Sequence, residues 1–407
     1  MRIALFSGNY NYLKEGANQA LNLLVRYLEE KAGSEVRVYS PVTDTPAFEP
    51  AGTLVPVPSV RLPVRGEFRL ALGLPRAVRA DIARFAPDIV HVATPDILDT
   101  RAQSFARRLN VPVVASLHTR FESYLSHYGL GWARPLVEAH LRRFYRRADH
   151  VLAPTALLVE ELRGMRGDDR ASLWSRGVDR TLFDPARRDG EWRRALDIAD
   201  DEVAILFFGR LVREKGVDIY AAVLRALRSR GMRVRPVVVG TGPARATFDE
   251  LSGAVLTGHL QDVALARAVA SADLLLTPSV TETFGNVVLE AMASGLPVIS
   301  ADAPSARALI DHGRTGLLCP PTDVAAYASA VERLIADPTE RRALGRATRE
   351  ASRSYRWDAA SDAVARCYRT LISERRSAPA RGSRPASNAA VRSSASSWSP
   401  VRERPSA

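Results

Sequence analysis

The sequence predicts an α/β protein made of two doubly wound, Rossmann-like parallel-sheet domains in series. The chain has 407 residues, more than one ordinary domain usually contains. Short apolar runs alternate with amphipathic helical stretches, a rhythm typical of parallel sheets covered by helices on both faces. The same alternation starts again after about residue 201, which indicates a second domain of the same class.

The first half opens with the apolar run at residues 2–6, which predicts a buried strand. The run is too short for a signal peptide and lacks a small-residue cleavage site. Apolar residues at helical spacing predict a helix over 18–31, and a second helix is expected over 135–147. The remaining expected strands of this half are 36–39, 89–92, 113–117 and 151–154.

The second half contains a further series of strand-like runs, with room for helices of about 10–15 residues between them. We expect a first domain over 1–176, a linker over 177–200 and a second domain over 201–354. A C-terminal helix over 355–376 is expected to return to the first domain. The expected strands of the second domain are 203–208, 235–239, 254–256, 274–277 and 297–300.

The last segment, 377–407, is rich in Ser, Pro, Ala and Arg and carries a single carboxylate, Glu403. It shows almost no apolar periodicity, which predicts a disordered tail. Two interpretations stay open at this point. The tail is either passive or a basic tether to a membrane or partner.

The composition limits the classes of function. The net charge is +12, and only three lysines occur, Lys14, Lys31 and Lys215, so almost all positive charge is arginine. No zinc-finger, RNP-type or helix-turn-helix pattern supports nucleic acid as a partner. The two cysteines lie far apart and have no metal-ligand spacing, which favours a reducing cytoplasm. No apolar run reaches the length of a membrane-spanning helix, which favours a soluble protein. A basic surface also suits a diphosphate substrate or an anionic membrane, so peripheral attachment to the inner face of the cytoplasmic membrane stays open.

Several glycine-rich turns follow expected strands. Ligands of open α/β sheets bind beyond the carboxyl ends of the strands, where backbone N–H groups and helix N-termini face a crevice. Gly16 opens the first helix, but no GxGxxG accompanies it, which disfavours a nicotinamide cofactor. Arg210 and Lys215 flank the loop after strand 203–208, where two cations would hold a diphosphate. Gly240 and Gly242 follow strand 235–239 and would let the backbone approach a base or ribose, although a tight turn explains them nearly as well.

The strongest motif is the segment 277–297. A strand ends at Thr277, Glu282 lies in the following loop, and a helix is expected to begin near Gly285. The free N–H groups of that first turn would bind phosphate oxygens. Glu290, just over one turn further, would accept both hydroxyls of a ribose, and Glu282 would reach sugar hydroxyls beyond the phosphates. The spacing therefore predicts a nucleotide diphosphate sugar lying across a helix start.

Taken together, these motifs resemble those of retaining glycosyltransferases of family 4, which have GT-B architecture with two domains facing a central cleft. The resemblance covers about residues 1–372. It rests on the segments 209–216, 239–243 and 314–318, on Pro278-Ser279, on Glu282 with Glu290, and on the run 290–298. Residues 116–128 and 174–179 look most like the mannosyltransferase-like and glycolipid-forming branches.

The resemblance implies roles for individual residues. Arg210 and Lys215 would hold the diphosphate, Glu290 the ribose, and Glu282 the donor hexose. His118 matches the active-site histidine of the family. Gly16 matches a glycine of the N-terminal phosphate-facing loop, although Ala17 stands where the family usually has a second glycine. The remaining residues expected beside the donor are Thr283, Phe284, Gly285 and Asn286.

By the same resemblance, the chain is expected to transfer a hexose with retention and without a metal or other cofactor. GDP-mannose is the favoured donor, a UDP-hexose comes next, and the acceptor is a lipid or a glycan. The resemblance implies front-face displacement, in which the acceptor hydroxyl attacks from the side that the diphosphate leaves. A sugar-nucleotide epimerase of the same fold and a non-catalytic nucleotide-sugar binder stay open as alternatives.

Overall fold

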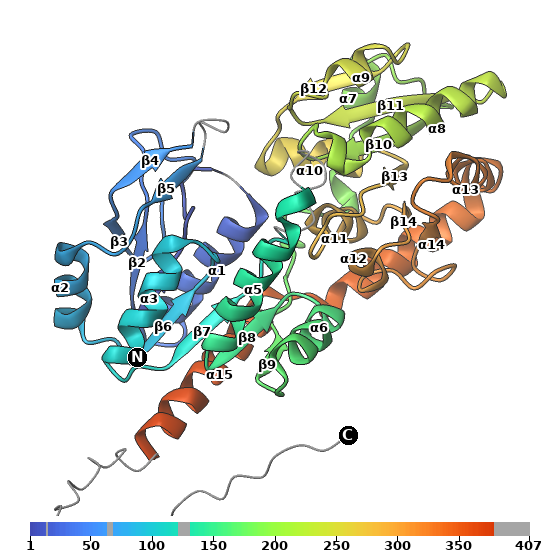
Figure 1. Ribbon diagram of the computed structural model, residues 1–407. Helices are drawn as coiled ribbons and strands as arrows, with labels where there is room; N and C mark the ends of the chain where they lie inside the picture. Colours follow the sequence, from blue (N-terminus) through green and yellow to red (C-terminus); the bar gives the residue numbers. More distant parts are fainter. Residues whose placement is uncertain (14, 63–67, 121–130, 378–407) are drawn as a thin grey trace, which may run out of the picture.

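The computed structural model describes residues 1–13, 15–62, 68–120 and 131–377. Two parallel sheets, each with helices on both faces, form two domains that lie side by side (Figure 1). This arrangement confirms the predicted fold class. The expected tail lies almost wholly outside the described residues, apart from Ser377, which ends the last helix.

The N-terminal sheet has seven parallel strands in the order β3-β2-β1-β6-β7-β8-β9. All five expected strands are present, each with ends within one residue of the expected ones. A separate antiparallel hairpin pairs β4 (Ser59–Arg61) with β5 (Arg69–Ala71). The strands of the sheet are β1 (Arg2–Phe6), β2 (Glu35–Ser40), β3 (Thr53–Pro56), β6 (Ile89–Val92), β7 (Val113–Ser116), β8 (His150–Ala153) and β9 (Ala171–Leu173); the helices are α1 (Gly16–Glu30), α2 (Arg76–Phe85), α3 (Ile97–Arg108), α5 (Arg134–Arg147) and α6 (Ala156–Arg166).

The C-terminal sheet has six parallel strands in the order β12-β11-β10-β13-β14-β15. In both sheets the direction of strand addition reverses once, beside β1 and β6 in one and beside β10 and β13 in the other. Such a reversal leaves a crevice at the carboxyl ends of the two neighbouring strands. The strands are β10 (Val203–Phe208), β11 (Val234–Val239), β12 (Val255–Gly258), β13 (Leu274–Thr277), β14 (Val298–Ala301) and β15 (Leu317–Cys319); the helices are α7 (Gly190–Ala195), α8 (Val217–Ser229), α9 (Ala246–Asp249), α10 (Asp262–Ala270), α11 (Asn286–Ala293), α12 (Pro304–Arg307), α13 (Val324–Ala336) and α14 (Pro338–Ala351).

Each sheet carries a hydrophobic core on both faces. Along β1, Ile3 and Leu5 pack into one core, whereas Ala4 and Phe6 pack into the other. Successive side chains of a strand point to opposite faces, so a strand covered on both sides must be apolar throughout. Burying each such leucine or isoleucine contributes about 1.5–3 kcal/mol. This requirement explains why continuous apolar runs located the central strands.

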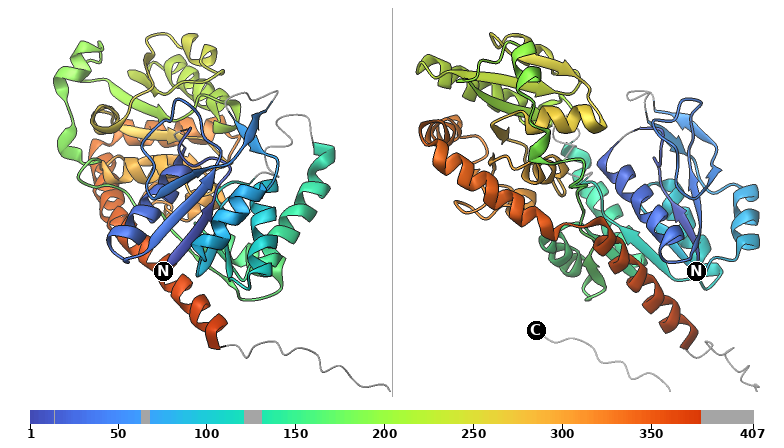
Figure 2. Two further views of the ribbon diagram at one scale, coloured as in Figure 1. Left: turned by 90° about the vertical axis from the view of Figure 1, so that its left-hand side faces the viewer. Right: turned by 180° about the vertical axis from the view of Figure 1, so that it is seen from behind.

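The C-terminal helix α15 (Trp357–Ser377) crosses back to the N-terminal domain and packs against α1 (Figures 1 and 2). Val364 and Tyr368 of this helix are fully buried in the same core as Leu21 and Leu24 of α1. The chain thus joins its two domains twice, once through the segment after β9 and once through α15.

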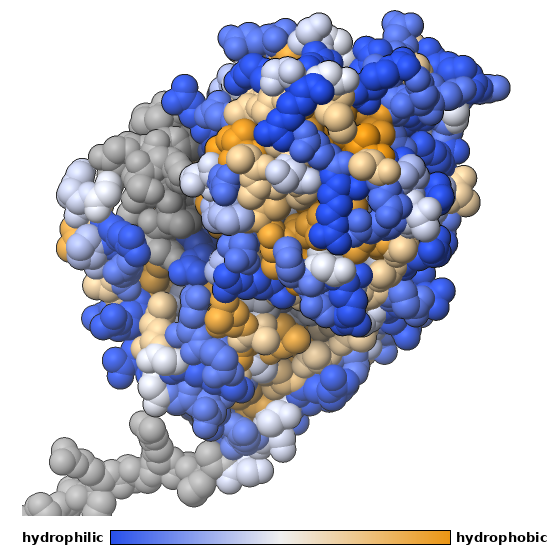
Figure 3. All heavy atoms as spheres, turned by 90° about the vertical axis from the view of Figure 1, so that its right-hand side faces the viewer, coloured by the Kyte–Doolittle hydropathy of each residue, from blue (hydrophilic) through white to orange (hydrophobic). Residues whose placement is uncertain are grey.

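One face of the molecule is seen in the space-filling view of Figure 3. Figure 3 shows polar residues over most of one face, with hydrophobic residues gathered in its hollows. Within the part of the chain that the structure describes, no helix is both long enough and apolar enough to cross a membrane.

Candidate active site

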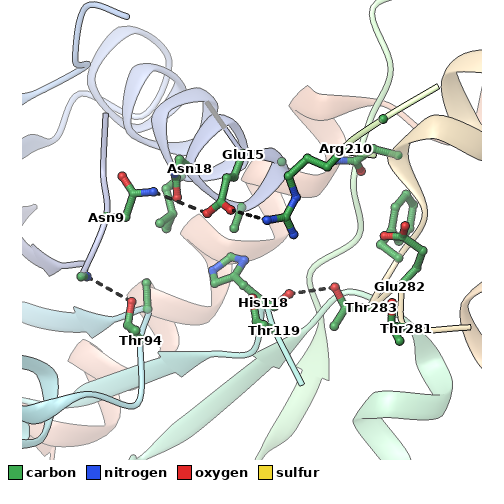
Figure 4. A pocket seen from close by; sticks show the side chains of 18 of the residues that line it. Asn9, Glu15, Asn18, Thr94, His118, Thr119, Arg210, Thr281, Glu282 and Thr283 are labelled. Carbon is green, nitrogen blue, oxygen red and sulfur yellow. Dashed lines mark hydrogen bonds and ion pairs between the residues drawn. The ribbon is translucent and has the colours of Figure 1, made fainter. Parts of the chain in front are cut away.

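A cleft of about 630 Å³ lies between the two domains, and both domains line it (Figure 4). Its walls are the loops that follow β1, β6 and β7 in one domain and β10 and β13 in the other. These are the loops at the two points where strand order reverses, where open α/β sheets bind ligands. The volume is within the usual range for a small-molecule site.

The C-terminal wall carries both cations that the sequence singled out. Arg210 and Lys215 lie in the loop after β10, and Glu282 faces them from the loop after β13. Lys215 Nζ contacts Glu282 Oε1, and the hydroxyl of Ser279 donates a second, longer hydrogen bond of 3.4 Å to the same oxygen. Burial alone would raise the pKa of Glu282, but Lys215 and then Arg210 outweigh it and hold this pKa below its ordinary value. Glu282 is therefore a carboxylate paired with the lysine.

Helix α11 begins at the cleft, as expected from the sequence. Gly285 precedes its first residue in a left-handed conformation, and no side chain among the described residues caps this end. The first amide groups of a helix have no partners inside the helix, and their partial positive charge favours an anion. Thr283, Phe284, Gly285 and Asn286 all line the cleft at this point. The helix start and the two cations therefore form one electropositive wall.

Glu290 lies one turn further along α11, outside the residues that line the cleft. Its side chain is half-buried, and burial raises the pKa of its carboxyl to about 8. The ribose role of Glu290 stays a prediction.

Gly240 and Gly242 also lie outside the cleft lining, and their geometry has a clear packing cause. A Cβ on Gly240 would come within 1.9 Å of the carbonyl oxygen of Gly209, and one on Gly242 within 2.3 Å of that of Leu211. Both residues also have positive φ angles, 143° and 157°. The loop after β11 thus supports the loop that carries Arg210. Contact with a base or ribose stays a prediction.

The N-terminal wall approaches the C-terminal wall at three points. The carboxylate of Glu15 lies 3.7 Å from the guanidinium of Arg210 (Figure 4). The hydroxyl of Thr283 donates a 2.7 Å hydrogen bond to the carbonyl oxygen of His118. A Cβ on Gly16 would lie 2.4 Å from Asn286 Nδ2, at the end of a side chain that would have to move, so the start of α1 lies close to the start of α11. The role of Gly16 that the structure supports is therefore close approach of the two domains.

His118 lies at the end of β7, at the base of the cleft, with both ring nitrogens engaged by the protein. Arg176 Nη2 lies 2.9 Å from Nδ1, and Ser116 Oγ lies 2.8 Å from Nε2. An arginine can only donate, so Nδ1 accepts and the ring proton is on Nε2, which donates to Ser116. Burial, then Arg176 and His91, hold the pKa of His118 well below its ordinary value. The imidazole is therefore neutral.

The same chain of hydrogen bonds continues into α15. His91 Nε2 lies 2.7 Å from Ser116 Oγ, and His91 Nδ1 contacts the hydroxyl of Tyr368. The hydroxyl of Ser116 therefore bridges the two imidazole rings. Burial lowers the pKa of His91 to about 3, so this imidazole is neutral as well. The orientation of His118 is thus fixed by residues from β6, β7 and the C-terminal helix.

Sequence reasoning missed several residues of the cleft. Asn9, Glu15, Thr94 and Asp96 line its N-terminal side, and Arg176 lines its base. Position was the available signal, since Asn9, Thr94 and Asp96 come two to four residues after β1 or β6, and Glu15 directly precedes α1. Burial raises the pKa of Asp96 to about 6, although backbone N–H groups at the start of α3 oppose that rise.

Across residues 1–13, 15–62, 68–120 and 131–377, no three His, Cys, Asp or Glu side chains gather in a way that would hold a metal ion. Neither cysteine lies at the cleft: Cys319 is buried in β15, and Cys367 lies in α15.

Comparison with known proteins gives consistent matches over most of the chain. The family model described as Glycosyltransferase Family 4 matches residues 15–182, and the one described as Glycosyl transferases group 1 matches residues 202–337. A GDP-mannose-dependent alpha-mannosyltransferase of Mycolicibacterium smegmatis is 36% identical, over 92% of this chain and 99% of the relative. The sulfoquinovosyl transferase SQD2 of Arabidopsis thaliana is 33% identical, over 89% of this chain and 72% of the relative. Among solved structures, the sucrose-phosphate synthase of Thermosynechococcus elongatus superposes with a TM-score of 0.75 at 21% identity, over 92% of this chain and 99% of that one.

Proposed function

The chain belongs to glycosyltransferase family 4, with the GT-B fold, and we propose that it is a retaining hexosyltransferase that favours GDP-mannose as donor and uses a lipid or glycan acceptor. A UDP-hexose is the second choice of donor. The preference for mannose is supported by the 36% identity to a GDP-mannose-dependent alpha-mannosyltransferase. That identity is moderate, and SQD2, at 33%, is a sulfoquinovosyl transferase. The family itself transfers a sugar from a nucleotide sugar.

The observation that carries the proposal is the electropositive wall of the cleft. When a glycosidic bond to a diphosphate breaks, negative charge grows on the leaving oxygens. Arg210, Lys215 and the N-terminus of α11 converge where such a group would lie, and they would stabilise the transition state more than the ground state. Lys215 would then exchange Glu282 for phosphate, leaving Glu282 to accept hydrogen bonds from hexose hydroxyls. Glu290 would accept the ribose hydroxyls.

His118 would orient the hexose rather than move a proton. Both of its ring nitrogens are already hydrogen-bonded within the protein, and the imidazole is neutral. Front-face displacement needs no separate side-chain base, because the leaving diphosphate can take the proton of the acceptor hydroxyl. The contribution of His118 is then geometric, through a ring held rigidly beside the anomeric carbon.

Helix α5 supports contact with an anionic membrane. Trp132, in the short turn before the helix, is 74% exposed, Leu136 in its first turn is 68% exposed, and further along Arg142, Arg143 and Arg146 are exposed. Exposed apolar side chains beside arginines fit the boundary between acyl chains and anionic headgroups. We propose that this face brings the enzyme to the inner surface of the cytoplasmic membrane. Co-sedimentation with phosphatidylglycerol vesicles at low salt is expected and should be lost in Trp132→Ser/Leu136→Ser; absence of binding at low salt would remove the idea.

A donor panel tests the function directly. GDP-mannose, UDP-glucose, UDP-glucuronate and UDP-galactose are compared by thermal shift, since a ligand that binds only the folded state stabilises it. GDP-mannose is expected to give the largest shift and to be consumed only when an acceptor is present. Consumption without acceptor would favour the epimerase alternative, and binding without any turnover would favour the non-catalytic one.

A further inference from the structure

Three arginines are buried among the described residues: Arg166, Arg176 and Arg193. Arg166 pairs with Asp168 at 2.8 Å, and Arg193 pairs with Asp273 at 3.0 Å. Arg176, which is 4% exposed, forms no ion pair with any carboxylate in the described part of the chain. It is also the one of these three arginines that lines the cleft.

The partners of Arg176 are all neutral. Its Nη1 donates to the carbonyl oxygens of Trp174 and Ser175, at 3.0 and 3.5 Å, and its Nη2 donates to His118 Nδ1. The guanidinium also lies over the indole of Trp174, 4.9 Å from the ring centre. A guanidinium has five N–H groups, so these three bonds leave two for another acceptor.

Such a charge is costly to bury. An ion removed from water needs an opposite charge as well as hydrogen bonds, and the other two buried arginines meet that rule. Burial lowers the pKa of Arg176 to about 10, so the side chain still carries its charge at neutral pH. Neutral partners satisfy the hydrogen bonds in part but leave the charge without a counter-ion. A substrate is the remaining source of one at the base of the cleft.

We propose that Arg176 binds an anionic group of a substrate, a carboxylate, sulfonate or phosphate, carried either by the donor hexose or by the acceptor. The inference rests on the proposed function and deepens it, because it names the chemical class of one substrate. The donor diphosphate is the less fitting source, because Arg210, Lys215 and the start of α11 lie on the opposite wall. Arg176 instead adjoins His118, where the hexose and acceptor would meet.

The test uses pairs of ligands that differ in one charged group. For the donor, GDP-mannose is compared with GDP-mannuronate and UDP-glucose with UDP-glucuronate, together with GDP and UDP alone. For the acceptor, dodecyl glucuronide is compared with dodecyl glucoside, using the best donor. The variants are Arg176→Gln, which removes the charge, and Arg176→Lys, which keeps it. Arg166→Gln is the matched control, a buried arginine away from the cleft.

The anionic member of one pair should be favoured at least tenfold in Kd or KM by the wild type. Arg176→Gln should abolish that preference, Arg176→Lys should retain part of it, and Arg166→Gln should leave it intact even if stability falls. Which pair responds identifies the source of the anion. Equal use of both members of every pair by the wild type would overturn the inference. It would also be overturned if Arg176→Gln weakened only the binding of GDP or UDP, because Arg176 would then act on the diphosphate. If the wild type binds no nucleotide at all, the proposed function fails first.

Discussion

Replacing Lys215 by alanine is the sharpest test of the electropositive wall. Lys215 Nζ contacts the carboxylate of Glu282, and their side chains are only 18% and 22% exposed. The substitution therefore has two effects. It removes a cation from the leaving diphosphate, and it leaves Glu282 as an unpaired anion facing the same group.

The two effects act in the same direction, and their size can be worked out. Removing one preorganised charge-stabilising group costs about 2.7–4 kcal/mol in the transition state, or about a hundred- to a thousandfold in kcat. Two unit charges about 5 Å apart, at an effective dielectric constant of about 20, repel by about 3 kcal/mol before screening. We therefore expect Lys215→Ala to lower kcat at least a hundredfold. Lys215→Ala/Glu282→Gln also removes the repelling charge, and after screening of that repulsion it should recover about tenfold in kcat relative to Lys215→Ala.

The assay is transfer measured at saturating donor, so that a change in binding alone cannot explain the result. Lys31→Ala is the matched control, because this exposed lysine ends α1 far from the cleft. Melting temperatures of both variants report on folding. Turnover within tenfold of wild type for a folded Lys215→Ala protein would refute the role of the lysine and weaken that of its neighbours.

Three further predictions concern single side chains. Burial raises the pKa of Glu290 from 4.5 to about 8, so this carboxyl stabilises the folded state below about pH 4.5 and loses that contribution as the pH rises to 8. The free energy of unfolding of Glu290→Gln should therefore fall less than that of the wild type between pH 5 and 8. Identical changes of urea stability with pH in the two proteins would contradict this. Glu15→Gln should free Arg210 from a half-exposed ion pair of about 0.5 kcal/mol and lower the donor KM about twofold; a higher KM would mean that Glu15 itself binds substrate. Thr283→Val removes the bond to the carbonyl of His118, about 1 kcal/mol, and should lower kcat/KM about fivefold, whereas an unchanged value would show that the contact does not persist during turnover.

The fold was predictable because its central strands are covered on both faces. The runs at Arg2–Phe6, Ile89–Val92, Val203–Phe208 and Leu274–Thr277 have the same bounds in the sequence and in the structure. Three of the four edge strands escaped prediction, and the fourth, β12 (Val255–Gly258), was expected at 254–256. β3, β9 and β15 have only three or four residues, β3 has no fully buried position, and β9 has a single one, so they show neither a long apolar run nor clean alternation.

The positions of the site residues were predictable, but their pairings were not. Arg210, Lys215 and Glu282 were placed at strand ends from local signals alone. The contacts of Arg210 with Glu15 and of His118 with Arg176 join residues far apart in sequence, and they depend on how strands and domains are arranged in space. Arg176 entered the sequence analysis only as part of the segment 174–179, through a family resemblance and with no role of its own. Nothing local in that segment indicates that its arginine is buried at the cleft without a carboxylate.

A crystal structure with bound GDP-mannose, or with the donor that the panel selects, tests the central claim most directly. We predict that the diphosphate oxygens lie within hydrogen-bonding distance of Arg210, of Lys215 Nζ and of the first amides of α11, with Lys215 no longer in contact with Glu282. A nucleotide bound elsewhere, or one in the cleft with its diphosphate facing away from Lys215, would contradict the account.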